Sequence, residues 1–113
     1  MLAKDKLSAA DAVFSALGPT LSGVELLHEA VERYLKGYLI SRRWRLVRTH
    51  NLIDLISAAT DFDASFEIFV ELAEELTEQF FLQHYPGNDL TDVGKNYSEL
   101  RRQAQLLIER IEI

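Results

Sequence analysis

The chain has 113 residues, 48% hydrophobic and 27% charged, which is the composition of one soluble globular domain. It contains no cysteine, which excludes disulfide bonds, thiolate metal sites and cysteine nucleophiles. No apolar run approaches the roughly 20 residues that span a bilayer, and no signal-type apolar core follows the charged N-terminus. We therefore expect a cytoplasmic protein without a membrane partner, forming one domain over residues 1–113.

The net charge of −6 is unevenly distributed along the chain. Four arginines fall within seven residues: Arg42, Arg43, Arg45 and Arg48. Acidic residues gather in the region that follows: Asp61, Asp63, Glu67, Glu71, Glu74, Glu75 and Glu78. The net field repels nucleic acid, so whole-protein charge does not predict its binding, but a local basic patch can still hold phosphate.

The first expected helix covers residues 2–16. Its apolar residues recur with helical spacing: Leu7, Ala10, Val13, Phe14 and Leu17. Gly18 and Pro19 end it, because glycine favours a helix C-terminus and proline cannot continue the helix.

The second expected helix begins at Ser22 and runs to about Ser41, because Ser22 and Glu25 have the spacing of a capping box. Its inner stripe is Val24, His28, Val31, Leu35 and Tyr38. Its outward or rim positions are Glu25, Glu29, Glu32, Arg33 and Lys36. Glu29 with Arg33, and Glu32 with Lys36, have the spacing of favourable ion pairs.

Three further helices are expected. Thr49 or Asn51 can cap a short helix ending near Thr60, and a turn at 61–63 separates it from a helix over 64–83. The inward residues of that fourth helix are Phe66, Phe69, Val70, Ala73, Leu76 and Phe80, and its acidic stripe is Glu67, Glu71, Glu74 and Glu78. After a break at 85–89, a fifth helix begins near 89–92, with the seam Val93, Tyr97, Leu100, Ala104, Leu107, Ile108 and Ile111.

These elements predict an all-α fold, a five-helix up-and-down bundle in which sequential neighbours pack antiparallel. No segment alternates apolar and polar residues as a half-buried strand does. Phe66, Val70, Phe80, Leu100 and Leu107 are expected in one shared core.

Three segments resemble the HEPN family of small helical bundles. The run 29–37 shares Ala30, Glu32, Leu35 and Lys36 with the family pattern, with Arg33 and Gly37 as similar residues and Glu29 in place of glutamine. Thr49-His50-Asn51-Leu52 is similar to the start of the family's next helix. His84-Tyr85-Pro86 is similar to a later motif but lacks its arginine.

The resemblance implies a five-helix HEPN-like domain that is often a homodimer and is often encoded beside a minimal nucleotidyltransferase. Some family members are metal-independent ribonucleases, and others are binding or assembly modules. We expect a HEPN-like binding and assembly module, a partner of a nucleotidyltransferase, that binds nucleotide or RNA through its basic segment. A purely structural helical assembly protein is a further alternative.

A toxin-type ribonuclease, as in a toxin–antitoxin pair, is the alternative that uses Arg45 and His50 as catalytic residues. Four residues separate them, which fits the family's arginine–histidine spacing, and Arg43 to His50 fits it with six. Histidine titrates near neutrality and arginine binds phosphate through two hydrogen bonds, which suits RNA cleavage without a metal. However, the family's catalytic motif usually lies later in the bundle, where this chain lacks it. A basic segment that binds rather than cleaves is the preferred interpretation.

The residues expected to bind a nucleotide, RNA or a partner are Arg42, Arg43, Trp44, Arg45, Arg48 and His50. Trp44 can stack on a base, but contact with a protein is the favoured role. His28 is expected in the core and His84 beside a turn. The histidines lack the spacing of a helical zinc motif, so no metal and no cofactor are expected.

Self-association is expected from the eleven aromatic residues. Tyr34, Tyr38 and Trp44 fall at the edges of apolar stripes, which predicts an exposed apolar patch. Because two-fold dimers are the commonest closed assemblies, a homodimer is the expected form.

Overall fold

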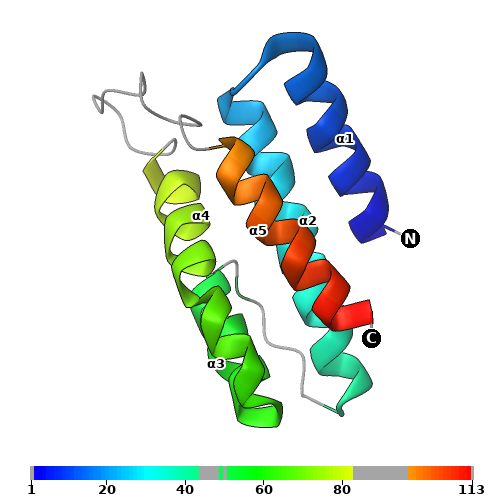
Figure 1. Cartoon of the computed structure of the whole chain (residues 1–113), viewed down its shortest axis with the longest axis vertical. Coiled ribbons are helices and arrows are strands. Elements are labelled where there is room, and N and C mark those ends of the chain that lie inside the picture. Colours follow the sequence, from blue (N-terminus) through cyan, green and yellow to red (C-terminus); the bar gives the residue numbers. More distant parts are fainter. Residues whose placement is uncertain (1, 44–48, 50, 83–96, 113) are drawn as a thin grey trace.

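The structure is a computed structural model that describes residues 2–43, 49, 51–82 and 97–112, with the side chains of 2, 21 and 80–82 left aside. The elements are α1 (Leu2–Leu17), α2 (Leu21–Ser41), α3 (Leu52–Phe62), the short 3-10 helix η1 (Ala64–Phe69), α4 (Val70–Leu82) and α5 (Tyr97–Glu112) (Figure 1). The predicted all-α five-helix bundle is confirmed, and the described residues contain no strand.

The first two helices form a hairpin closed by Gly18, whose φ of 73° is readily accessible only to glycine. The expected capping box at Ser22 and Glu25 is wrong. Thr20 is the N-cap of α2, since its backbone is extended and its hydroxyl accepts the N–H of Gly23 at 3.0 Å. The helix α2 therefore starts at Leu21, earlier than the Ser–Glu spacing indicated.

The boundary between α3 and α4 differs from the expected one. α3 continues to Phe62 instead of ending near Thr60, and Asp63 then caps η1 by accepting the N–H of Ser65 at 3.0 Å. Phe66 and Phe69 lie three residues apart in η1, and both are buried. A 3-10 helix has three residues per turn, so it places both rings on one face, and their predicted inward positions are confirmed although the segment is not α-helical.

The helix directions follow from contacts at one end of the bundle. The rings of Tyr38 near the end of α2 and Phe66 just after α3 lie 4.8 Å apart, and Arg110 near the end of α5 pairs with Asp63. α2, α3 and α5 therefore run the same way, while α1 and α4 run against them (Figure 1). The expected antiparallel packing of neighbours holds for α1 with α2, for α3 with α4 and for α4 with α5. It is wrong for α2 and α3, which run the same way because the contact of Tyr38 with Phe66 brings their C-terminal ends together.

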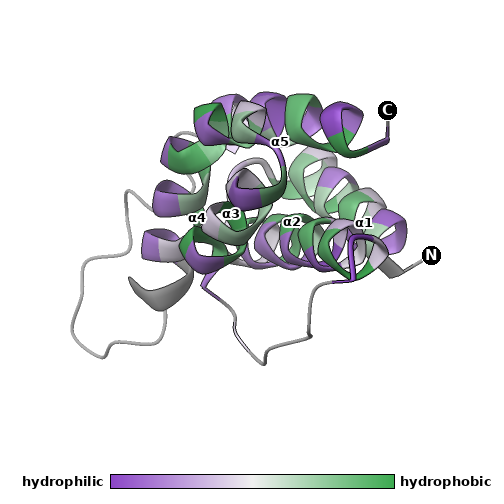
Figure 2. Ribbon diagram, turned by 90° about the horizontal axis from the view of Figure 1, so that it is seen from below, coloured by the Kyte–Doolittle hydropathy of each residue, from purple (hydrophilic) through white to green (hydrophobic). Residues whose placement is uncertain are grey.

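One extended core joins all the helices. It is built from Ala10, Val24, Leu27, Val31, Leu35, Tyr38, Leu39, Leu52, Leu55, Ile56, Ala59, Phe66, Phe69, Leu72, Ala73, Leu76, Tyr97, Leu100, Ala104 and Leu107. Three of the five predicted core residues are in it, Val70 packs against it partly buried, and the side chain of Phe80 lies outside the described residues. Figure 2 shows that each helix carries hydrophobic and hydrophilic residues side by side, as amphipathic helices around a shared interior must.

Several surface expectations need correction. Tyr34 and Tyr38 are only 5% and 9% exposed, because Tyr34 packs with Ala3 and Ile108 and Tyr38 packs on Phe66, so they do not form an exposed aromatic patch. The large apolar side chains that are exposed are Leu17, Ile40, Ile53, Phe62, Ile68 and Leu106. Glu29 pairs with Lys6 of α1 at 3.1 Å rather than with Arg33, because α1 packs alongside this part of α2.

The predicted break at 85–89, His84, Val93 and the expected start of the fifth helix at 89–92 lie outside the described residues. Within them, α5 carries the rest of its predicted seam: Tyr97, Leu100, Ala104, Leu107 and Ile108 are buried, and Ile111 is partly buried. No helix in the described part of the chain is long and apolar enough to cross a membrane.

Candidate functional site

The predicted basic segment begins where α2 ends. Arg42 is the C-cap, and its guanidinium carbon lies 5.3 Å from the centroid of the Tyr38 ring, a cation–π arrangement. Arg43 has a φ of 63° and donates its N–H to the carbonyl of Ile40 at 2.9 Å, so it ends the helix in the left-handed conformation that glycine usually adopts there. Both arginines are exposed, and neither forms an ion pair within the described residues.

The other predicted binding residues, Trp44, Arg45, Arg48 and His50, lie outside the described residues. The structure therefore brings together two members of the predicted set, Arg42 and Arg43. Tyr38, which the sequence assigned to the inner stripe, also belongs to this site, because the Arg42 guanidinium stacks over its ring.

The start of α3, directly after the basic segment, is held by three side chains. Asn51 is the N-cap and accepts the N–H of Ile53 at 2.9 Å, which confirms one of the two predicted caps. The hydroxyl of Thr49 accepts the N–H of Asn51 at 3.0 Å. From α4, the hydroxyl of Thr77 accepts the buried N–H of Leu52 at 3.2 Å. The described residues on either side are thus held by hydrogen bonds: Arg42 and Arg43 to the end of α2, and Thr49, Asn51 and Leu52 at the start of α3.

A column of polar side chains runs along the inner side of α2. His28 is fully buried, as predicted, and its Nδ1 lies 3.9 Å from Oε1 of Glu32. The other carboxylate oxygen of Glu32 accepts a hydrogen bond from Nζ of Lys36 at 3.0 Å, the expected pair. Glu32 is only 8% exposed, so its predicted outward or rim position is wrong. It follows His28 by four residues, which leaves it on the same inward side of the helix, and Lys36 covers it from the next turn.

Sequence reasoning missed two buried polar residues of α4, Thr77 and Gln79, which are each 6% exposed. Gln79 donates a hydrogen bond to Glu75 at 2.8 Å. A signal for Thr77 was available, since it follows Ala73 by four residues and so continues the apolar stripe with a hydroxyl. A polar group at such a position implies a hydrogen-bonding partner on a neighbouring element.

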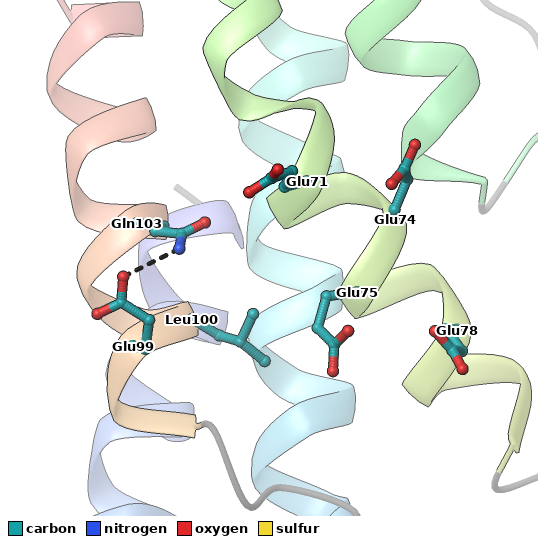
Figure 3. A pocket seen from close by; sticks show the side chains of 7 residues that line it. All are labelled: Glu71, Glu74, Glu75, Glu78, Glu99, Leu100 and Gln103. Carbon is teal, nitrogen blue, oxygen red and sulfur yellow. Dashed lines mark hydrogen bonds between the residues drawn. The ribbon is translucent and has the colours of Figure 1, made fainter.

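An acidic groove of about 590 Å³ lies between α4 and α5 (Figure 3). It is lined by Glu71, Glu74, Glu75, Glu78, Glu99, Leu100 and Gln103. The predicted acidic stripe of α4 is confirmed as an exposed face. Arg102 and Gln103 hydrogen-bond the carboxylate of Glu99 and lower its pKa to about 2, so Glu99 stays ionised. No three metal-binding side chains are placed to hold an ion among the described residues.

The family model of the HEPN domain matches residues 2–113, which is nearly the whole chain. The chain belongs to the HEPN domain family. Neither the curated proteins nor the solved structures contain a significant match to it.

In this HEPN protein, most residues that carried the family resemblance have structural roles. Ala30, Leu35 and Leu52 are completely buried, and Glu32 and Lys36 form an ion pair along α2. The run 29–37 and the Leu52 helix start therefore specify how α2 and α3 pack. Arg42 and Arg43, which lie between the two segments, are instead exposed.

Proposed function

We propose that this HEPN protein is a binding and assembly module, and that its basic segment, residues 42–48, contacts a phosphate-bearing ligand, either a nucleotide or RNA. A nucleotidyltransferase-type protein is its proposed partner, and the proposed working form is a homodimer. His50 contributes to the helix start that follows the segment.

One observation carries the proposal. Arg42 and Arg43 are exposed at the end of α2 without an ion-pair partner in the described part of a protein whose net charge is −6. Carboxylates are plentiful in this chain, so two arginines left unneutralised leave a charge that an external anion can satisfy. Arginine suits phosphate because its planar guanidinium can donate two parallel hydrogen bonds.

A fluorescent single-stranded RNA and, separately, ATP are suitable probes. Arg43→Ala and Arg45→Ala should each weaken binding, and each should make the remaining RNA binding less salt-dependent, by about 0.7 in the slope per lost phosphate contact. Arg102→Ala is the matched control, since Arg102 is an exposed arginine paired with Glu99 on α5. It removes the same charge far along the chain and should leave the salt slope unchanged.

The same RNA distinguishes binding from cleavage. His50→Ala should change binding little if the protein stays folded. Metal-free cleavage of the RNA by the wild-type protein, lost in both Arg45→Ala and His50→Ala, would overturn the proposal in favour of the ribonuclease. Equal binding and equal salt slopes in the wild type, Arg43→Ala and Arg45→Ala would exclude the basic segment as the binding site.

The proposed protein partner needs a separate experiment. A minimal nucleotidyltransferase encoded beside this chain should co-purify with it after co-expression. Arg42→Glu combined with Arg43→Glu should reduce the recovered complex if the basic segment faces the enzyme, whereas Arg102→Glu should not.

A further inference from the structure

The end of α2 extends past the start of α1. Ala3 near the start of α1 packs in one cluster with Tyr34, so the last turns of α2 have no part of α1 beside them (Figure 1). A hollow of about 340 Å³ opens there, lined by Tyr34, Gly37, Tyr38 and Ser41 of α2 and by Ile111 and Glu112 of α5. Its lining is mostly apolar, and Ile40, three residues from Gly37, is 52% exposed at its side.

Within the described residues of one copy, no contact requires glycine at position 37. It lies inside α2, where glycine weakens a helix relative to almost any other residue. A Cβ atom added to it would meet nothing within 4 Å, and its φ is not positive, so neither space nor backbone conformation requires glycine. A glycine on an exposed helix face does allow another backbone to approach closely.

Opposite charges stand on the two edges of this hollow. Glu112 lies on the α5 edge. Arg33 precedes Gly37 by four residues, which places it on the side of α2 that faces away from Tyr34, Tyr38 and α5. Both side chains are exposed, and neither forms an ion pair in the described structure, since Glu29 pairs with Lys6 instead of Arg33.

We propose that this hollow is the contact between two copies of the chain, related by a two-fold axis close to Gly37. The two α2 ends then cross at Gly37 and Ser41, Ile40 of each copy is covered, and Arg33 of each copy faces Glu112 of the other. The inference deepens the proposed self-association, on which it rests, by naming the surface that forms the dimer.

Charge complementarity favours a second copy over another occupant. A two-fold contact needs a patch that complements itself, because each residue meets the other copy's surface. A patch with one basic and one acidic edge fulfils this requirement when rotated onto itself. A partner of uniform charge would leave either Arg33 or Glu112 facing a like charge, which costs binding energy.

Sedimentation equilibrium of the full chain measures the contact directly. The wild type should be dimeric at about tens of micromolar. Gly37→Gln should raise the dimer dissociation constant by about tenfold or more, because the added side chain separates the two helices. The same variant should unfold at equal or higher urea concentration when dilute, because glutamine favours a helix more than glycine does. Loss of the dimer therefore cannot be attributed to misfolding.

Charge reversal tests the pairing across the axis. Arg33→Glu and Glu112→Arg should each weaken the dimer, and the double variant should recover most of the loss. Ala12→Gln, an exposed position on α1, is the control and should match the wild type. An unchanged dimer in Gly37→Gln, a double variant weaker than either single one, or a wild type that stays monomeric would overturn the interface. RNA binding through the basic segment is measured separately, so its failure and the failure of this interface are distinguishable.

Discussion

Thr77 and Leu52 are 25 residues apart in sequence, yet the Thr77 hydroxyl accepts the buried N–H of Leu52 at 3.2 Å. This N–H is among the first of α3, which have no partner within their own helix. A side chain of α4 thus completes the cap of α3. It also fixes the start of α3 against α4.

Thr77→Val should lower the free energy of unfolding by about 1–3 kcal/mol, because the valine keeps the volume but leaves the N–H of Leu52 buried without an acceptor. Thr60→Val is the control, because the hydroxyl of Thr60 only donates to the carbonyl of Ile56 within α3, at 2.8 Å. Urea denaturation of both variants measures the difference. Equal losses would show that the bond from α4 contributes no more than a hydroxyl bonded to its own helix.

Leu107→Ala should cost about 2–5 kcal/mol of unfolding free energy, because Leu107 is completely buried in the shared core. The adjacent Leu106 is 45% exposed, so Leu106→Ala in the same helix should cost much less. Chemical denaturation with circular dichroism compares them. Similar costs for both leucines would mean that α5 presents a different face to the core.

Tyr97→Phe should leave stability unchanged or raise it by about 1 kcal/mol. The Tyr97 hydroxyl is buried and has no hydrogen-bond partner among the described residues, and the ring keeps its contact with Phe14, whose centroid is 4.8 Å away. Removing an unsatisfied buried hydroxyl removes a desolvation cost while the stacked rings remain. A clear loss of stability in thermal unfolding would show that a bound water or another group satisfies this hydroxyl.

The same residue predicts a response to alkaline pH. Burial, followed by the nearby charge of Asp11, raises the pKa of Tyr97 above 10.0, although Arg101 opposes this. The folded protein therefore holds this proton more tightly than the unfolded chain, and stability falls as pH rises above about 10. Tyr97→Phe should show a shallower fall than the wild type over this range. If stability fell equally steeply with pH in the wild type and in Tyr97→Phe, Tyr97 would not be the group responsible for the loss.

In acid, Glu99 should titrate near its pKa of about 2, because Arg102 and then Gln103 hydrogen-bond its carboxylate. Because the pKa of Glu99 is lowered in the folded protein, the stabilisation by its ionised carboxylate is fully present above pH 4.5, the usual pKa of the group. It is lost as the pH falls towards 2. Arg102→Ala should move the titration of Glu99 towards the usual value, as carboxyl NMR shifts can follow. Gln103→Ala should produce a smaller change in the same direction.

Helical periodicity was sufficient to predict the five helices and most of their inward faces. His28, Leu35, Leu100 and Leu107 are buried as predicted, because residues three or four apart share one face of a helix wherever it packs. The acidic stripe of α4 follows from the same rule. Local chemistry predicted the Asn51 cap, since it involves only neighbours in the chain.

Competing local caps and contacts between distant segments decided the rest. Thr20 rather than Ser22 caps α2, and η1, capped by Asp63, replaces the first turns of the expected fourth helix. Glu29 pairs with Lys6 because α1 packs alongside α2. At the candidate site, the sequence alone located the four crowded arginines. The fold established that Arg42 lies over Tyr38, that Thr77 holds the start of α3 and that Glu32 is buried, because these relations depend on how helices pack, which no periodic pattern within one helix contains.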